Sequence, residues 1–201
     1  MQESRDDTFE TIFQEIANDP MNSDMIARGY LPLYTAHSDA RIVIVGQAPG
    51  TKAQASMKPW NDASGDTLRK WMGVSEGEFY NPAYFAHIPM DFFYPGKGKS
   101  GDLPPRKGFA AKWHPKLLAL MPNVELVILI GAYAQKYYLG KNAKQNLTET
   151  VRAHYEYHPT YFPVVHPSPL NFRWHTRNGW FLERVVPELK GRVQDILNKR
   201  G

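Results

Sequence analysis

Four short apolar runs occur along this chain, and polar residues interrupt them only rarely. They lie at 41–46, 84–88, 124–130 and 162–165, and the clearest reads Val124-Glu125-Leu126-Val127-Ile128-Leu129-Ile130. A strand that is covered on both faces of a sheet needs no alternation of apolar and polar residues. The four runs therefore predict the buried strands of a mostly parallel sheet.

Apolar residues at helical spacing lie between these runs. Before the first strand, Phe9, Ile12, Phe13 and Ile16 predict a helix near residues 7–18. Ser64 can cap a helix that ends at Gly73. The other helices expected from spacing lie near 110–121, from Gly131, over 148–157, and from Gly179 onward, where Pro187 would kink or split the last one.

Strands that alternate with helices, without a break in composition, favour one α/β domain over residues 1–201. We expect a three-layer α/β/α sandwich around a roughly four-stranded, mostly parallel sheet, with an N-terminal helical extension over about residues 1–38. No apolar run approaches the ~18 residues of a membrane span, and the chain does not begin with a signal-peptide pattern. A cytoplasmic protein that does not bind membranes is expected.

Composition narrows the chemistry in two ways. The absence of cysteine excludes disulfides, thiolate nucleophiles and Cys-ligated metal or iron–sulfur sites. The net charge is +4, and one stretch of sequence gathers several basic residues around a single acidic one, Asp102. The basic residues are Lys97, Lys99, Arg106, Lys107 and Lys112. A flexible basic loop suits contact with a phosphate backbone, but a merely solvated loop would look the same.

Two loops directly follow predicted strands, although they are far apart in sequence. The first is Gly46-Gln47-Ala48-Pro49-Gly50, and the second is His166-Pro167-Ser168-Pro169-Leu170-Asn171. Ligands of open α/β sheets bind at the carboxyl ends of the strands, so both loops should border one site. The prolines of the second loop make it stiff, and a rigidly held imidazole can donate a hydrogen bond to charge that develops during a reaction.

Together the two loops resemble those of the uracil-DNA glycosylase superfamily. In that family the first loop reads Gly-Gln-Asp-Pro-Tyr or Gly-Glu-Ala-Pro-Gly, and the last reads His-Pro-Ser-Pro-Leu-Ser or a close variant. Pro59-Trp60-x-x-Ala63-Ser64-Gly65 is similar to the Pro-Phe-x-Gly-x-x-Gly stretch of the family's iron–sulfur branch. The resemblance covers roughly residues 41–190. Because the chain lacks the four cysteines of that branch, it would be a cluster-free member.

The resemblance implies a monofunctional DNA glycosylase that acts in base excision repair. Such an enzyme flips uracil, or a related deaminated base, out of DNA and hydrolyses its N-glycosidic bond without a metal or cofactor. Its partner would be DNA that contains a damaged base, and a monomer is expected.

The resemblance also implies roles for residues around the base. His166 would stabilise the departing anionic base, while Gln47 and the backbone at Ala48 would position water and base. Trp60 would stack on the flipped ring. His87 occupies the place of an asparagine that reads the uracil edge in the family.

A second set of implied roles concerns the DNA backbone and the gap left by the flipped base. Leu170 would wedge into the duplex, with Asn171 beside it. Ser64 and Ser168 would donate to phosphates, and Arg173 would add positive charge nearby.

The chain departs from the family pattern at the catalytic carboxylate. The family has an aspartate or an adjacent glutamate in the first loop, whereas this chain has Ala48 preceded by the neutral Gln47. The acids that could replace it are Asp62, Asp66 and Asp91, and the sequence does not choose among them. The base could be uracil, hypoxanthine, xanthine or another lesion, because His87 cannot reproduce the paired contact of an asparagine.

Other functions stay open at this point. The missing carboxylate favours a catalytically lost or retargeted member that binds nucleic acid or a free base. A small-molecule nucleotide hydrolase would use the glycine loops to hold phosphate. His154 and His158 would share one face of a helix and could begin a metal site, although surface histidines are the more common explanation.

Overall fold

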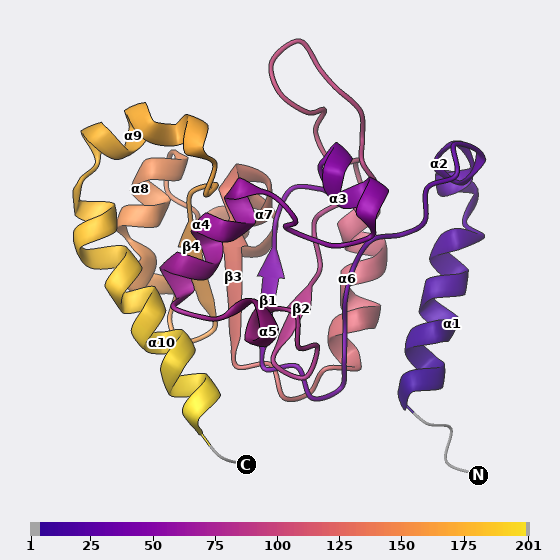
Figure 1. Ribbon diagram of the computed structural model, residues 1–201, viewed down its shortest axis with the longest axis horizontal. Coiled ribbons are helices and arrows are strands. Elements are labelled where there is room, and N and C mark those ends of the chain that lie inside the picture. The colour runs from indigo at the N-terminus through magenta and orange to yellow at the C-terminus, as the bar shows by residue number, and fades with distance from the viewer. Residues whose placement is uncertain (1–4, 200–201) are drawn as a thin grey trace.

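The computed structural model describes the backbone of residues 5–199 and the side chains from residue 8 onward. Its sheet contains β1 (Ile42–Val45), β2 (Phe85–His87), β3 (Leu126–Ile130) and β4 (Tyr161–Val164) in the order β2-β1-β3-β4. Every neighbouring pair is parallel, so the predicted four-stranded sheet is confirmed. Figure 1 shows the strands at the centre of the molecule, with the carboxyl end of β1 pointing to the top of the view.

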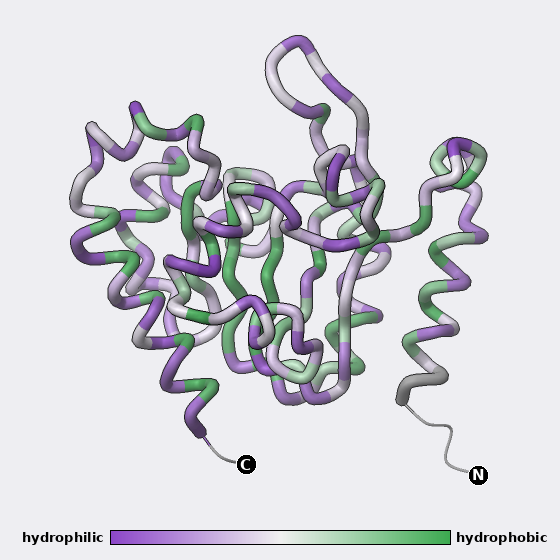
Figure 2. Tube along the Cα trace, in the orientation of Figure 1, coloured by the Kyte–Doolittle hydropathy of each residue, from purple (hydrophilic) through white to green (hydrophobic). Residues whose placement is uncertain are grey.

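Helices cover both faces of this sheet. Successive strand residues point to opposite sides, so each face presents apolar side chains that helices bury. Val43, Val45 and Leu129 pack toward α1 (Arg5–Ala17) and α6 (Phe109–Ala119). Ile42, Ile44 and Ile128 pack toward α4 (Ala63–Met72) and α10 (Val186–Asn198). Every residue of β1 and β3 is buried, and Figure 2 shows these strands as apolar along their length. The three-layer α/β/α architecture is therefore confirmed.

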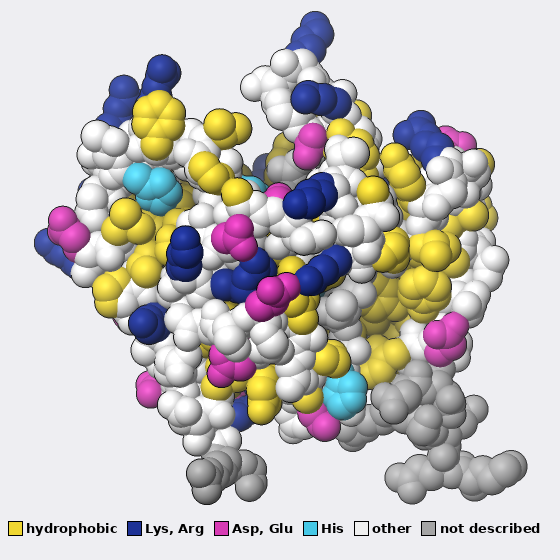
Figure 3. Space-filling view, viewed as in Figure 1, with side chains coloured by type: hydrophobic (Ala, Val, Ile, Leu, Met, Phe, Trp, Pro, Cys, Tyr) yellow, Lys and Arg dark blue, Asp and Glu magenta, His cyan; other side chains and the backbone are white. Residues whose placement is uncertain are grey.

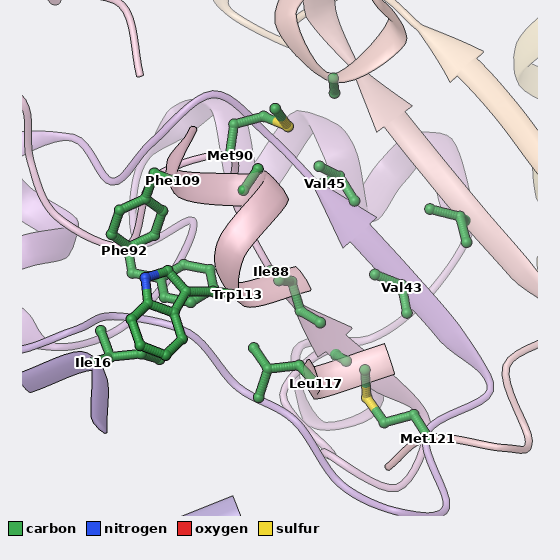
Figure 4. Packing of buried hydrophobic residues seen from close by; sticks show 14 of the residues in the cluster. Ile16, Val43, Val45, Ile88, Met90, Phe92, Phe109, Trp113, Leu117 and Met121 are labelled. Carbon is green, nitrogen blue, oxygen red and sulfur yellow. The ribbon is translucent and has the colours of Figure 1, made fainter. Parts of the chain in front are cut away.

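The N-terminal segment belongs to the first of these layers. Ile16 of α1 lies in the same buried cluster as Phe92 and Trp113, and Figure 4 shows the three side chains close together. After α2 (Ser23–Ala27), the chain runs extended to β1 and forms an antiparallel bridge between Thr35 and His87 at the end of β2. The extension thus reaches the carboxyl end of an edge strand.

The remaining helices are short and lie mostly in the connections. They are α3 (Thr51–Ser56), α5 (Glu76–Phe79), α7 (Gly131–Leu139), α8 (Leu147–Arg152) and α9 (Phe172–Arg177). None of the helices within residues 5–199 is long and apolar enough to cross a membrane.

Two details of the predicted helices were wrong, and a third agrees with the structure. The cap of α4 is Asp62, whose Oδ1 accepts from the Gly65 amide at 3.0 Å, and Ser64 is buried inside the first turn. The helix expected over 148–157 is instead α8 followed by a separate 3-10 turn at His154–Tyr157. The helical tail expected from Gly179 is divided near Pro187 as expected, because a π-helical segment, Phe181–Val185, ends directly before α10 and Pro187 lies in the first turn of α10.

Candidate active site

A cavity of about 150 Å³ opens at the carboxyl ends of β1 and β2. Its walls contain the residues predicted for catalysis and base contact, which are Gln47, Ala48, Trp60, His87 and His166. The prediction that the two strand-end loops meet at one site is therefore confirmed. Apolar wall comes from residues such as Leu33 and Ile44, so the site combines an apolar surface with polar groups of about equal extent.

His166 lies at the mouth of the cavity on a braced loop. The Asn171 side-chain amide donates to the His166 carbonyl at 2.7 Å, which ties the two ends of the loop together. The surrounding protein desolvates the ring and lowers the pKa of His166, while the negative charges of Asp62 and Asp102 oppose that shift. Since the ordinary value is about 6.5, the imidazole is mainly neutral at pH 7.

Trp60 packs against His166 in a backbone conformation that few bulky residues adopt. The two ring centroids are 5.8 Å apart, and Trp60 has a φ of 56° in the left-handed region. Two glycines make room for it. A Cβ on Gly46 would lie 2.9 Å from the indole, and one on Gly65 would lie 1.9 Å from the Trp60 carbonyl oxygen. Strain held in place at a cavity wall is characteristic of functional sites.

His87 forms the deeply buried part of the cavity wall, with 1% of its surface exposed. Its Nδ1 lies 2.8 Å from the Thr35 hydroxyl, whereas its Nε2 is buried without a hydrogen-bond partner among the described residues. Burial, aided by the charge of Arg69, lowers the pKa of His87 to about 3, so the ring is neutral at pH 7.

Of the three carboxylates considered from the sequence, Asp62 lines the cavity, whereas Asp66 and Asp91 do not. Asp91 has no exposed side chain and is held by the Arg106 guanidinium at 2.8 Å, so it is a structural ion pair that does not line the cavity. Asp66 is exposed and paired with Arg69. Asp62 does line the cavity, and so does Asp102, which sequence analysis noted only as the single acid of a basic stretch.

Asp102 reaches the cavity on a hairpin that projects from the sheet edge. The Leu103 amide donates to the Gly96 carbonyl at 2.9 Å and the Gly98 amide donates to the Gly101 carbonyl at 2.8 Å, which closes the hairpin. The Gln47 side chain donates to the Leu103 carbonyl at 2.8 Å. Gln47 thus fastens the hairpin, the projecting loop at the top of Figure 1, to the strand-end loop after β1.

The residues predicted to contact DNA lie outside the cavity wall. The Ser168 hydroxyl accepts from the Leu170 amide at 3.2 Å and caps a short turn. Leu170 is 85% exposed, and Arg173 is exposed beside Phe172 on α9. Ser64 is only 8% exposed, so its predicted phosphate contact would require the DNA to reach a buried hydroxyl.

The histidine pair considered for a metal site faces a single carboxylate. His154 Nε2 lies 2.8 Å from Glu188, and His158 Nδ1 lies 3.5 Å from the same side chain. The two histidines do not share a helix face, because a 3-10 turn ends between them. Among the described side chains, no group of three His, Cys, Asp or Glu residues is arranged to hold a metal ion.

The chain is similar to the solution NMR structure of a "putative Uracil DNA glycosylase" from Methanosarcina acetivorans, with 13% identity and a TM-score of 0.48 over 82% of this chain and 96% of that one. The family model described as the uracil DNA glycosylase superfamily matches residues 32–190, which include both strand-end loops and the whole sheet. The chain therefore belongs to the uracil DNA glycosylase superfamily.

Proposed function

We propose that this protein is a monofunctional DNA glycosylase that excises uracil from DNA by base flipping, as a step of base excision repair. The observation that carries the proposal is that one cavity brings together a neutral histidine, a stacking indole and a buried imidazole, His166, Trp60 and His87. Family membership supports the same class of reaction.

The size of the cavity favours a pyrimidine over a purine. An engineered protein cavity of ~150 Å³ holds a molecule of benzene, a single six-membered ring. The cavity here has about the same volume, 150 Å³, so it matches uracil better than the two fused rings of hypoxanthine or xanthine. Trp60 would stack on the ring, an interaction worth ~1–3 kcal/mol per base.

The reaction requires charge stabilisation on both sides of the broken bond. When the bond between C1′ and the base nitrogen breaks, its electron pair goes to the base and C1′ becomes electron-poor. A neutral His166 would donate a hydrogen bond to the anionic base. A carboxylate beside it would stabilise C1′ and accept a proton from the water that adds there. Ala48 cannot serve, and Asp62 or Asp102 would supply that charge from another part of the cavity wall.

The surface around the cavity suits a flipped nucleotide. Leu170 and Phe172 are exposed by 85% and 61%; Leu170 lies in the His166 loop, and Phe172 follows it directly. An apolar wedge at this place would fill the space that the flipped base leaves in the duplex. Ser168, Asn171 and Arg173 would position the adjacent backbone. These steps use only groups of the chain and a water molecule. We also propose that the protein acts as a monomer.

The experiment is excision from labelled oligonucleotides that carry one uracil, hypoxanthine or xanthine, either single-stranded or paired. We expect uracil release by the wild type and a loss of about 10²-fold or more in His166→Ala, since removing one donor to a developing anion costs about that much. His37→Ala is the matched control, because His37 does not line the cavity. Intact DNA binding without release of any base would contradict the proposal and favour a catalytically lost member.

A further inference from the structure

The Nε2 of His87 is a buried polar atom in a residue that lines the cavity. It has no hydrogen-bond partner among the described residues, although the residue is only 1% exposed and lines the cavity. Buried polar groups in native proteins are nearly always satisfied, so an exception at a cavity wall indicates a partner that arrives with the substrate. Whether Nε2 would donate or accept depends on where the single proton of the neutral ring resides.

The surroundings of Thr35 decide the position of that proton. The Thr35 hydroxyl oxygen lies 2.8 Å from His87 Nδ1 and 3.1 Å from the His87 backbone amide, whose hydrogen is shared between this oxygen and the Thr35 carbonyl. If Nδ1 carried the proton, the hydroxyl would accept twice and its own hydrogen would have no acceptor among the described residues. If Nε2 carries the proton, the hydroxyl accepts from the amide and donates to Nδ1. The second arrangement uses every hydrogen at this junction.

We propose that Thr35 holds His87 in the Nε2-protonated tautomer, so that the cavity wall presents an N–H donor that selects a pyrimidine with a carbonyl oxygen at its 4-position. This inference rests on the proposed function. Uracil carries an acceptor oxygen there, whereas cytosine carries an amino group, which would meet the N–H donor without forming a hydrogen bond. Thr35 is a positioning residue, because it acts on the base only through His87.

The position of Thr35 in the chain gives the N-terminal segment a part in specificity. Thr35 and His87 form a two-way backbone bridge in which the Thr35 amide donates to the His87 carbonyl at 3.0 Å and the His87 amide donates to the Thr35 carbonyl at 2.9 Å. This bridge fixes the hydroxyl against the imidazole. The ring cannot turn away from Thr35 without breaking the contact at Nδ1.

The first test is the tautomer of His87 in the free protein. The ¹⁵N shifts of its ring at pH 7 report which nitrogen is protonated, and His87→Gln identifies the signals. We expect a protonated Nε2 and a bare Nδ1 in the wild type and in Thr35→Ser, which keeps the hydroxyl. In Thr35→Val, which has the same shape without a hydroxyl, we expect a mixture. A protonated Nδ1 in the wild type would overturn the proposal.

The second test is the ratio of uracil to cytosine excision from single-stranded oligonucleotides in single turnovers. We expect Thr35→Val to excise uracil about tenfold more slowly and to show a smaller ratio, since one hydrogen bond is worth about that factor. Thr35→Ser should restore both to within about twofold. Thr67→Val, which loses a hydroxyl on α4, is the control for the substitution itself.

The two tests separate this inference from the proposed function. An unchanged ratio in Thr35→Val, with a folded protein by its urea midpoint, would overturn the selection of the base. If the wild type excises no base at all, the proposed function fails. In that case the ring shifts still decide whether Thr35 sets the tautomer, and the role in base selection falls with the function.

Discussion

At the scale of single residues, Asp62 is the best-positioned substitute for the missing carboxylate. Its Oδ1 is fixed by the Gly65 amide at the N-terminus of α4, where the helix dipole favours a negative charge. Its charge acts on His166 more strongly than that of Asp102, as the larger of the two effects that raise the pKa of His166. Asp62 is therefore a preorganised anion, whereas Asp102 resides on a projecting hairpin.

We predict that Asp62→Asn lowers the excision rate of uracil by about 10²-fold or more, because a positioned general base contributes ~10²–10⁴-fold. Asparagine caps helices as well as aspartate does, so the free energy of unfolding should change by less than about 0.5 kcal/mol. Single-turnover kinetics and urea unfolding measure the two quantities.

Asp66→Asn is the matched control for this charge removal, since it neutralises an exposed aspartate in the same helix outside the cavity. Full activity in Asp62→Asn would contradict the role of Asp62. A loss in Asp102→Asn instead would assign the carboxylate to the hairpin.

Sequence reasoning placed residues at the cavity where their position follows from their own neighbours in the chain. Gln47 and His166 were found because each directly follows a buried strand. Thr35 and Asp102 were missed, since only tertiary contacts bring Thr35 against His87 and Asp102 to the cavity wall. Asp91 was considered as a catalytic acid because it follows the second strand, but its burial against Arg106 cannot be seen in the sequence.

At the scale of elements, the segment between α3 and α4 is built around one close approach. A Cβ added to Gly65 would lie only 1.9 Å from the backbone carbonyl oxygen of Trp60. The Tyr80 hydroxyl donates to the neighbouring Pro59 carbonyl at 2.9 Å and holds the segment from the other side. These contacts maintain the left-handed Trp60, a conformation that costs ~1–3 kcal/mol.

We predict that Gly65→Ala destabilises the protein by about 2 kcal/mol or more, because the added methyl would collide with backbone rather than with a movable side chain. Uracil excision should fall with it, since Trp60 must shift. Gly77→Ala in α5 is the control. It meets no atom within 4 Å and should be neutral or stabilising by ~0.5–1 kcal/mol. Equal unfolding free energies in the two variants would show that the close approach is not rigid.

The strands were predictable and some helices were not, for a physical reason. Burial on both faces leaves a strong apolar signature, so all four strands were found near their true positions. Residues 148–157 look helical by spacing, but Asn146 caps α8 and the chain leaves the α-helix after Arg152. The competition between an α-helix and a 3-10 turn is decided by local contacts that spacing does not encode.

At the scale of the whole molecule, two projections flank the mouth of the cavity and carry positive charge. One is the hairpin with Lys97 and Lys99, and the other is α9 with Arg173 and Arg177. Figure 3 shows Lys and Arg side chains at the tips of both projections, at the top of the view. By contrast, two basic residues of the same stretch of sequence, Arg106 and Lys112, form ion pairs with Asp91 and Asp19.

This arrangement predicts which cations hold DNA. We expect the affinity for single-stranded DNA to fall as the salt concentration rises. The slope of the logarithm of the binding constant against the logarithm of the salt concentration should become shallower by about 0.7 for each phosphate contact removed. The variant that replaces both Lys97 and Lys99 with glutamine should therefore show a clearly reduced slope in fluorescence anisotropy titrations at several salt concentrations. The control is the double variant Lys141→Gln and Lys190→Gln, which removes the same number of charges from residues that lie on neither projection. It should leave the slope unchanged. If both double variants reduced the slope equally, the binding would follow net charge alone, and the hairpin would have no specific part in holding DNA over the cavity.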